Sequence, residues 1–389
     1  MQPNGGMTTY GCGVINLTTG DPEDAEFWAK LSAAARDGDY AYALLFFSKS
    51  CFDPDMLCDA MAEKCSGLPY AACSTAGELG ANANEEGSLV AIVFPKDKFE
   101  IEAIRISGLR TIGMERIVEQ VSDAKNRFVS KDDKDVFALC LIDGLSVMEE
   151  TVTAALHWGL DDVPLLGGSA GDDMRFAETS LILNGELGND CAILLLVKSE
   201  VPFHVFKTDN FVPTPRKLVV TRSDPGERII YEFNAAEAAS EYARVIGIDP
   251  ADLSPMSFAS HPLVVRVGGE YYCRSVQKMN DDGSLSFFCA IDDGIVLTVA
   301  EPAGMTRTTR QAFQDVKNQI GGIDFVLGFD CVLRRIDAQN RQATQRIAEI
   351  YRENNVVGFN TYGEQYLSMH LNQTFTGIAF GQAEDKGAN

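Results

Sequence analysis

The sequence predicts an α/β protein, built of repeated strand–helix–strand units in layered mixed sheets and divided into two domains. Short apolar runs alternate with amphipathic stretches of helical length, a pattern typical of βαβ crossovers. A turn of the form hydroxyl-x-Gly-acid follows such a unit three times, beginning at Thr75, Ser169 and Thr361. Between the second and third copies, a segment of hairpin-like strands indicates a different kind of sheet. We therefore predict one domain over residues 1–205 and a second over 206–389.

Each unit has the same order of strand, helix, strand, turn and closing strand, which indicates an internal repeat. In the first unit these elements are expected at residues 42–47, 54–65, 68–73, 74–78 and 89–94. In the second they are expected at 136–141, 147–159, 163–166, 168–172 and 192–197. In the third they are expected at 325–329, 338–353, 356–359, 360–364 and 375–380. The first helix has Asp53 as its expected cap and Pro54 at its first position.

The segment between the second and third units is expected to form a hairpin, a helix capped by Asn234 and an antiparallel meander. The expected strands are 218–222, 228–233, 263–267, 271–276 and 285–291, and the expected helix is 235–245.

The recurring turn has a physical use for each of its residue types. Its glycine permits a positive φ or a close backbone approach, and its hydroxyl and acid can hold freed backbone donors. Ligands on open α/β sheets usually bind off the carboxyl ends of strands, where all three turns would lie. Thr75, Ser169 and Thr361 are therefore candidate binding residues. The alternative is that these turns only reverse the chain.

Composition limits the class of partner. The chain has 389 residues, 46% of them apolar, and a net charge of −23, which disfavours direct binding to nucleic acid or to an anionic membrane. Its apolar runs fall short of the roughly 20 residues that a membrane span needs, and its N-terminus does not resemble a signal peptide. We therefore expect a cytoplasmic protein. Its ten cysteines lack zinc spacings and are expected to be buried thiols.

The turn motifs resemble those of a known family. Residues 73–78 and 167–173 are similar to the signature turns of the FIST N-terminal domain, and residues 358–365 with 372–376 are similar to the FIST C-terminal domain. The resemblance covers about 40–382 and implies a non-catalytic ligand sensor.

Within that superfamily, four further stretches resemble the stand-alone haem-binding nitric-oxide sensors of the NosP type. These are residues 260–266, 272–276, 285–294 and 330–335. This resemblance implies haem b as cofactor, nitric oxide as signal, and a histidine kinase or cyclic-di-GMP enzyme as partner. A homodimer is left open.

An axial haem ligand in a sensor is usually an imidazole, and the chain has four histidines. His157 is expected to pack on a helix, and His204 to face either a pocket or solvent. His261 precedes a proline at the start of a strand, and the resemblance favours it as the metal ligand. His370 lies near the third turn and is the second candidate. Cys289 and Cys331 are weaker thiolate candidates.

Arginines are scarce in this acidic chain, so Arg274 and Arg334, with neighbouring Arg335, are candidate partners for a carboxylate. That carboxylate could belong to a haem propionate or to an amino-acid ligand. An ion pair with one of the chain's own acids is the alternative.

An enzyme reading rests on residues 167–171, which match the G-x-S-x-G nucleophile elbow. Ser169 aligns with Thr75 and Thr361, however, so its hydroxyl is a recurring part of the turn. We therefore predict no catalysis. Three readings stay open for the predicted cleft: a haem site, a site for a small organic ligand such as an amino acid, and a pure interaction scaffold.

Overall fold

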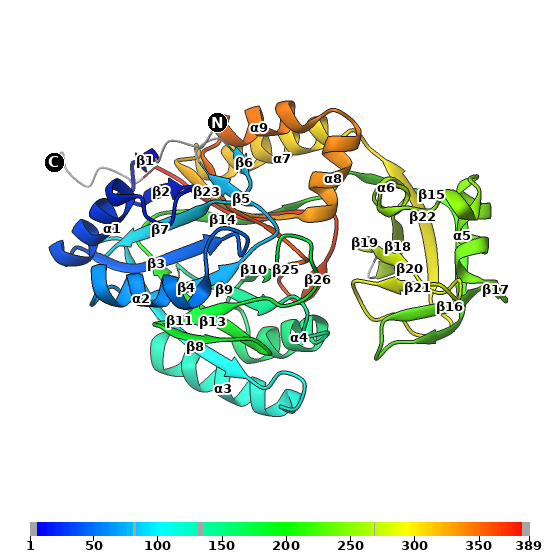
Figure 1. The fold of residues 1–389 in the computed structure, drawn as a ribbon, viewed down its shortest axis with the longest axis horizontal. Coiled ribbons are helices and arrows are strands. Elements are labelled where there is room, and N and C mark those ends of the chain that lie inside the picture. Colours follow the sequence, from blue (N-terminus) through cyan, green and yellow to red (C-terminus); the bar gives the residue numbers. More distant parts are fainter. Residues whose placement is uncertain (1–5, 81–82, 131–134, 268, 383–389) are drawn as a thin grey trace.

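A computed structural model describes residues 6–80, 83–130, 135–267 and 269–382. It confirms the predicted α/β fold class with layered mixed sheets. Three sheets with their helices form a body, and a fourth, antiparallel sheet forms a lobe beside it (Figure 1). Within the described ranges, none of the helices has the length and apolarity that crossing a membrane requires.

The first unit of the body confirms the predicted order and adds a strand and a helix before it. Its elements are β2 (Ile15–Thr19), α1 (Ala25–Asp37), β3 (Tyr40–Phe47), α2 (Pro54–Lys64), β4 (Tyr70–Ser74), β5 (Glu78–Gly80), β6 (Ala83–Glu85) and β7 (Leu89–Pro95), with β1 (Gly6–Thr9) at the sheet edge. Asp53 caps α2 as predicted, because its Oδ1 accepts hydrogen bonds from the amides of Asp55 and Met56 at 3.0 and 3.1 Å.

The second unit repeats this order element for element. It contains β8 (Phe99–Ser107), α3 (Met114–Phe128), β9 (Val136–Asp143), α4 (Glu149–Leu160), β10 (Leu165–Ala170), β11 (Leu181–Leu183), β12 (Glu186–Gly188) and β13 (Cys191–Ser199).

The third unit follows the same order with one interruption. It contains β14 (Phe203–Thr208), α7 (Met305–Ile320), β23 (Phe325–Cys331), α8 (Val332–Asn340), α9 (Thr344–Glu353), β24 (Val356–Thr361), β25 (Glu364–Tyr366), β26 (Met369–Leu371) and β27 (Phe375–Phe380). The single helix predicted over 338–353 is wrong. Two helices occupy this region, because Gln342 adopts a φ of 53° and ends the first of them.

The three units interlock by exchanging short hairpins. The hairpin β5–β6, from the first unit, pairs with β24 of the third. The hairpin β25–β26, from the third unit, pairs with β10 of the second, and β11–β12, from the second, pairs with β4 of the first. The exchange therefore closes a ring of three sheets with an approximate threefold arrangement.

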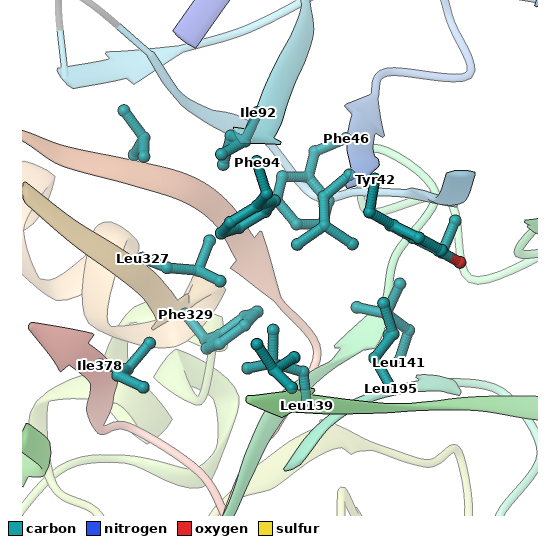
Figure 2. Close-up of a cluster of buried hydrophobic side chains, with 14 of the residues drawn as sticks. Tyr42, Phe46, Ile92, Phe94, Leu139, Leu141, Leu195, Leu327, Phe329 and Ile378 are labelled. Atoms are coloured by element: carbon teal, nitrogen blue, oxygen red, sulfur yellow. The ribbon is translucent and has the colours of Figure 1, made fainter. Parts of the chain in front are cut away.

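The three sheets share one apolar core. Alternate side chains of each sheet point into it, as the pleat requires. Figure 2 shows contributions from the first unit at Tyr42, Phe46, Ile92 and Phe94, from the second at Leu139, Leu141 and Leu195, and from the third at Leu327, Phe329 and Ile378. The other face of each sheet packs on its own helices. Cys65 is buried among these helix-facing residues and Cys58 packs against them; the cysteines within the described ranges are free thiols.

The lobe is inserted between β14 and α7 of the third unit. It contains β15 (Phe211–Asp224), β16 (Ile229–Phe233), β17 (Ala236–Glu237), α5 (Ala238–Ile246), the 3-10 turn Pro250–Asp252, α6 (Pro255–Ser260), β18 (Leu263–Val267), β19 (Glu270–Arg274), β20 (Val276–Met279), β21 (Leu285–Phe287) and β22 (Val296–Pro302). The amide of Ala303 donates to the carbonyl of Asn210 at 2.7 Å, so the chain enters and leaves the lobe at one place. The division at residue 205 stays a prediction; the strands of the third unit pair with those of the first two, whereas the lobe forms a sheet of its own.

Three details of the lobe differ from the sequence prediction. Asn234 does not cap α5, since it lies in a turn with φ 51° and its Oδ1 accepts from the amide of Val219. The strand predicted over 271–276 is split between β19 and β20, which pair with different neighbours. The strand predicted over 285–291 ends at Phe287.

Candidate functional site

The three recurring turns meet and hydrogen-bond to one another. The amide of Ala76 donates to the carbonyl of Asn360 at 2.9 Å, that of Ser169 donates to Gly363 at 2.8 Å, and that of Gly171 donates to Ser74 at 3.0 Å. This mutual pairing follows from the hairpin exchange, because each turn lies between a strand of its own unit and the hairpin that its unit sends into a neighbouring sheet. The turns are therefore the joint at which the three units are fastened together.

Two of the predicted hydroxyls form hydrogen bonds within this joint. Thr75 donates to Glu78, and Thr361 donates to Glu364; all four side chains are fully buried. The second oxygen of each carboxyl accepts from a hydroxyl ten residues further on, Ser88 at 2.9 Å and Thr374 at 2.6 Å. Burial raises the pKa of Glu78 to about 7 and that of Glu364 to about 8.

The third hydroxyl belongs to a polar chain that leads towards the lobe. Ser169 Oγ accepts from Gln365 Nε2 at 2.9 Å, and the same amide nitrogen lies 3.1 Å from His370 Nδ1. The predicted residues Ser169 and His370 thus lie on either side of the side-chain amide of Gln365. Because that amide separates hydroxyl from imidazole, and because Ser169 is fully buried, they do not form the nucleophile–base pair of an elbow hydrolase.

His370 lies at the contact between body and lobe. It is 4% exposed, and burial lowers its pKa to about 4, which nearby Glu150 opposes and Arg228 and Arg274 reinforce. A backbone hydrogen bond joins it to Phe288 of the lobe. The imidazole is therefore neutral near pH 7 and occupied by protein partners.

The other predicted residues of the lobe are spread over its surface. His261 ends α6, with Nδ1 3.3 Å from the carbonyl of Ser257, and is partly exposed. Arg274 is partly buried at the end of β19, donates to the carbonyl of Cys273 at 3.0 Å, and has no carboxylate within 4 Å in the described parts of the chain. Arg274 is thus not committed to an ion pair within the described chain.

Arg334 is committed to an internal pair. Its side chain is 1% exposed and its Nε lies 3.0 Å from Asp330 Oδ1. It also donates to Asn210, the residue at which the chain enters the lobe, at 3.3 Å. Arg334 therefore forms the internal ion pair that was the alternative from the sequence. Through Asn210, it also holds the point at which the lobe is attached.

A cavity of about 550 Å³ lies where the lobe meets the body. Gly144, Leu145 and Val147, in the loop before α4, form the body's side, and β16, β20 and β21 with their turns form the lobe's side. Its size falls within the range of small-molecule sites. The three recurring turns do not line it, although the sequence placed the ligand against them.

The sequence did not single out the strongest polar contact at this junction. Arg228 Nη2, from the lobe, lies 2.6 Å from Glu149 Oε2 and also bonds to Glu150. The second oxygen of Glu150 accepts from the amide of Ala290, in the lobe, at 2.9 Å. Arg228 sits in an ordinary-looking hairpin turn, and its partners are 78 and 79 residues away, so no local signal could have paired them. Within the described ranges, no cluster of three or more metal-ligating side chains occurs.

The architecture is thus a body of three fastened α/β units with an inserted lobe and a cavity at their junction. The FIST N domain model matches residues 41–236, and the FIST C domain model matches residues 238–367. The chain belongs to the FIST family, whose domains are sensory domains that bind small ligands and are not catalytic as a class.

An uncharacterized protein of Methanocaldococcus jannaschii is 21% identical over 262 residues, an alignment that covers 58% of this chain and 50% of that protein. The chain thus spans about half the length of this curated relative. The two family segments meet at β17, within the lobe, so neither coincides with the body or with the lobe.

Proposed function

We propose that this chain is a non-catalytic sensor that binds a small organic ligand, such as an amino acid, in the junction cavity and regulates a partner signalling protein. The observation that carries this proposal is the position of the cavity: one wall belongs to the body and the other to the lobe. A ligand that touches both walls binds best when the two are held together, so it favours one arrangement of the protein over others.

The lining of the cavity suits a polar ligand. Gln277, Asn280, Ser284 and Ser286 offer amides and hydroxyls, while Leu145 and Phe288 offer apolar surface. Arg274 lies outside this lining, at the end of β19, which precedes β20 in the chain, and has no carboxylate of the described chain within 4 Å. It is the predicted residue that best suits the acid group of such a ligand.

Haem was the leading expectation from the sequence, and the residues of this junction do not fit it. The cavity's lining contains neither histidine nor cysteine to hold iron, and His370 is occupied by Gln365 and Phe288. Among its lining residues, Arg228 already holds two carboxylates, and Glu227, Asp281 and Asp282 would repel the two propionates. Haem and nitric oxide, and the likeness to NosP sensors, therefore stay predictions that an absorption spectrum tests.

The partner also stays a proposal. A histidine kinase or a cyclic-di-GMP enzyme is the class that the family resemblance suggests, because FIST sensors often occur in signalling proteins. A homodimer also stays a prediction.

A thermal-shift screen with amino acids, amines and sugars tests the ligand site, because a compound that binds only the folded state raises its melting temperature. Gln277→Trp, which fills the cavity from β20, should abolish the shift. Gln314→Trp, on the exposed face of α7, should leave it unchanged. A shift that survives Gln277→Trp would place the ligand elsewhere.

A further inference from the structure

Two sets of polar contacts tie the lobe to the body; in addition, α6 packs on α8, and Phe288 of the lobe packs with Val332, Leu333 and Tyr362 of the body. At one end, Asn210 and Ala303 carry the chain across, and Arg334 braces Asn210. At the other end, Glu149 and Glu150 of the body hold Arg228 and the amide of Ala290 in the lobe. The first set includes the covalent chain and must persist, whereas the second can open. Motion of the lobe would therefore hinge at Asn210 and separate the two sides at Arg228.

We propose that Arg228, Glu149 and Glu150 form a latch whose opening sets the arrangement of lobe and body, and that a ligand in the adjacent cavity holds it closed. This inference rests on the proposed function for the ligand's part; the latch itself follows from the contacts alone. Arg228 belongs both to the latch and to the cavity lining, so occupancy of the cavity acts directly on it.

The electrostatics of the latch leave it close to balance between closed and open. Two carboxylates face one guanidinium, and the side chains of Arg228 and Glu149 are 8% and 3% exposed. The Nε donor of Arg228 is buried without a hydrogen-bond partner among the described residues. Burying charges that are incompletely paired offsets much of their mutual attraction, whereas opening returns all three groups to water. Such a contact is held only when something else favours closure.

The backbone supplies a second, independent reason. Arg228 has a φ of 55° and Val147, on the opposite wall, has a φ of 63°. Positive φ is strained for any residue with a side chain and most of all for a β-branched one. Val147 lies two residues before Glu149, so the strain sits at the base of the latch. Strained residues of this kind cluster at ligand sites and switch regions.

Hydrogen exchange at the amide of Ala290 measures directly how often the latch opens. This residue is exposed, so the hydrogen bond from its amide to Glu150 is what protects that amide from exchange with solvent. Hydrogen exchange at this amide in the full chain, measured without ligand, therefore reports how often the latch opens.

Three variants test the proposal. Glu150→Gln keeps an oxygen acceptor for Ala290 but removes one charge from Arg228, and should speed exchange of the Ala290 amide about tenfold. Val147→Gly removes the backbone strain of the closed state and should slow exchange of the Ala290 amide by a similar factor. Glu119→Gln, which breaks the exposed pair with Arg116 on α3, should leave it unchanged.

Equal exchange in Glu150→Gln and Glu119→Gln would overturn the latch, as would an Ala290 amide that exchanges only with the core amides of β9. The two proposals fail separately. A screen in which no compound shifts the melting temperature would count against the ligand site, while the exchange rates, obtained without ligand, decide the latch.

Discussion

Glu364 is fully buried and accepts a hydrogen bond from the hydroxyl of Thr361 and another from that of Thr374. Glu78 accepts in the same way from Thr75 and Ser88. Each pair fastens a turn to the hairpin that it sends into a neighbouring sheet. Two of the three joints of the body therefore contain an acid whose pKa burial raises to neutrality or above it.

These acids predict that stability falls as the pH rises from about 4.5 towards about 8. The folded-state pKa of Glu364, about 8, lies above the ordinary value of 4.5, so the folded state binds the proton more tightly. This contribution is complete below pH 4.5 and is lost as the pH rises through about 8. Glu364→Gln mimics the protonated acid, and its free energy of unfolding should vary less between about pH 6 and pH 9 than that of the wild type. Denaturant titrations at each pH measure this; an unchanged pH profile would contradict it.

Gly358 is predicted to be irreplaceable for a steric reason. A Cβ there would lie 1.9 Å from the carbonyl oxygen of Gly328, and the backbone has a φ of 146°. Gly358→Ala should therefore destabilise the protein by about 3 kcal/mol or more, because backbone atoms on the paired strand cannot move aside. Gly321→Ala is the matched control. It also has positive φ, but its Cβ would meet nothing within 4 Å, so it should cost about 1 kcal/mol.

The repeats could be predicted from the sequence because their signals are local. Asp53 before Pro54, or a glycine two residues after a hydroxyl, can be recognised without knowing the fold. The exchange of hairpins could not, since β5 and β25 are three residues each and their partners lie far away in the chain. The break between α8 and α9 has no glycine or proline to announce it.

The site was harder to predict than the fold. From residue type alone, Arg334 and Arg274 were equal candidates, but Arg334 is neutralised by Asp330, which lies four residues earlier at the end of β23. Arg228 was not predicted as a site residue, because an arginine in a turn is common and its partners Glu149 and Glu150 are far away in the sequence. Thr75 and Thr361 were recognised as a recurring feature, and the structure gives them a structural use; their part in binding stays a prediction.

An absorption spectrum decides between haem and an organic ligand. Protein produced with an ample haem supply should show no intense band near 400 nm, because the cavity lining contains no histidine or cysteine to hold the iron, and its acidic residues Glu227, Asp281 and Asp282 would repel the propionates. If a band appears, His261→Ala and His370→Ala identify the ligand: loss or shift of the band in one variant assigns that imidazole. A band would refute the organic-ligand proposal for this chain and restore the likeness to NosP sensors.

The inserted lobe predicts that the body folds without it. The equivalent connections in the first two units, residues 20–24 and 108–113, are short, and Asn210 and Ala303 are already hydrogen-bonded to each other. Residues 211–302 can therefore be replaced with a two-residue Asn-Gly turn, which is a tight connection of the kind found in hairpins. This turn should join Asn210 to Ala303 and complete the third unit. The shortened chain should unfold cooperatively, since the core of Figure 2 is drawn from the body alone. It should also lose every ligand-induced shift seen in the full chain. A molten product would show that the lobe stabilises the body, and a ligand response that survives would place the binding site within the three fastened units.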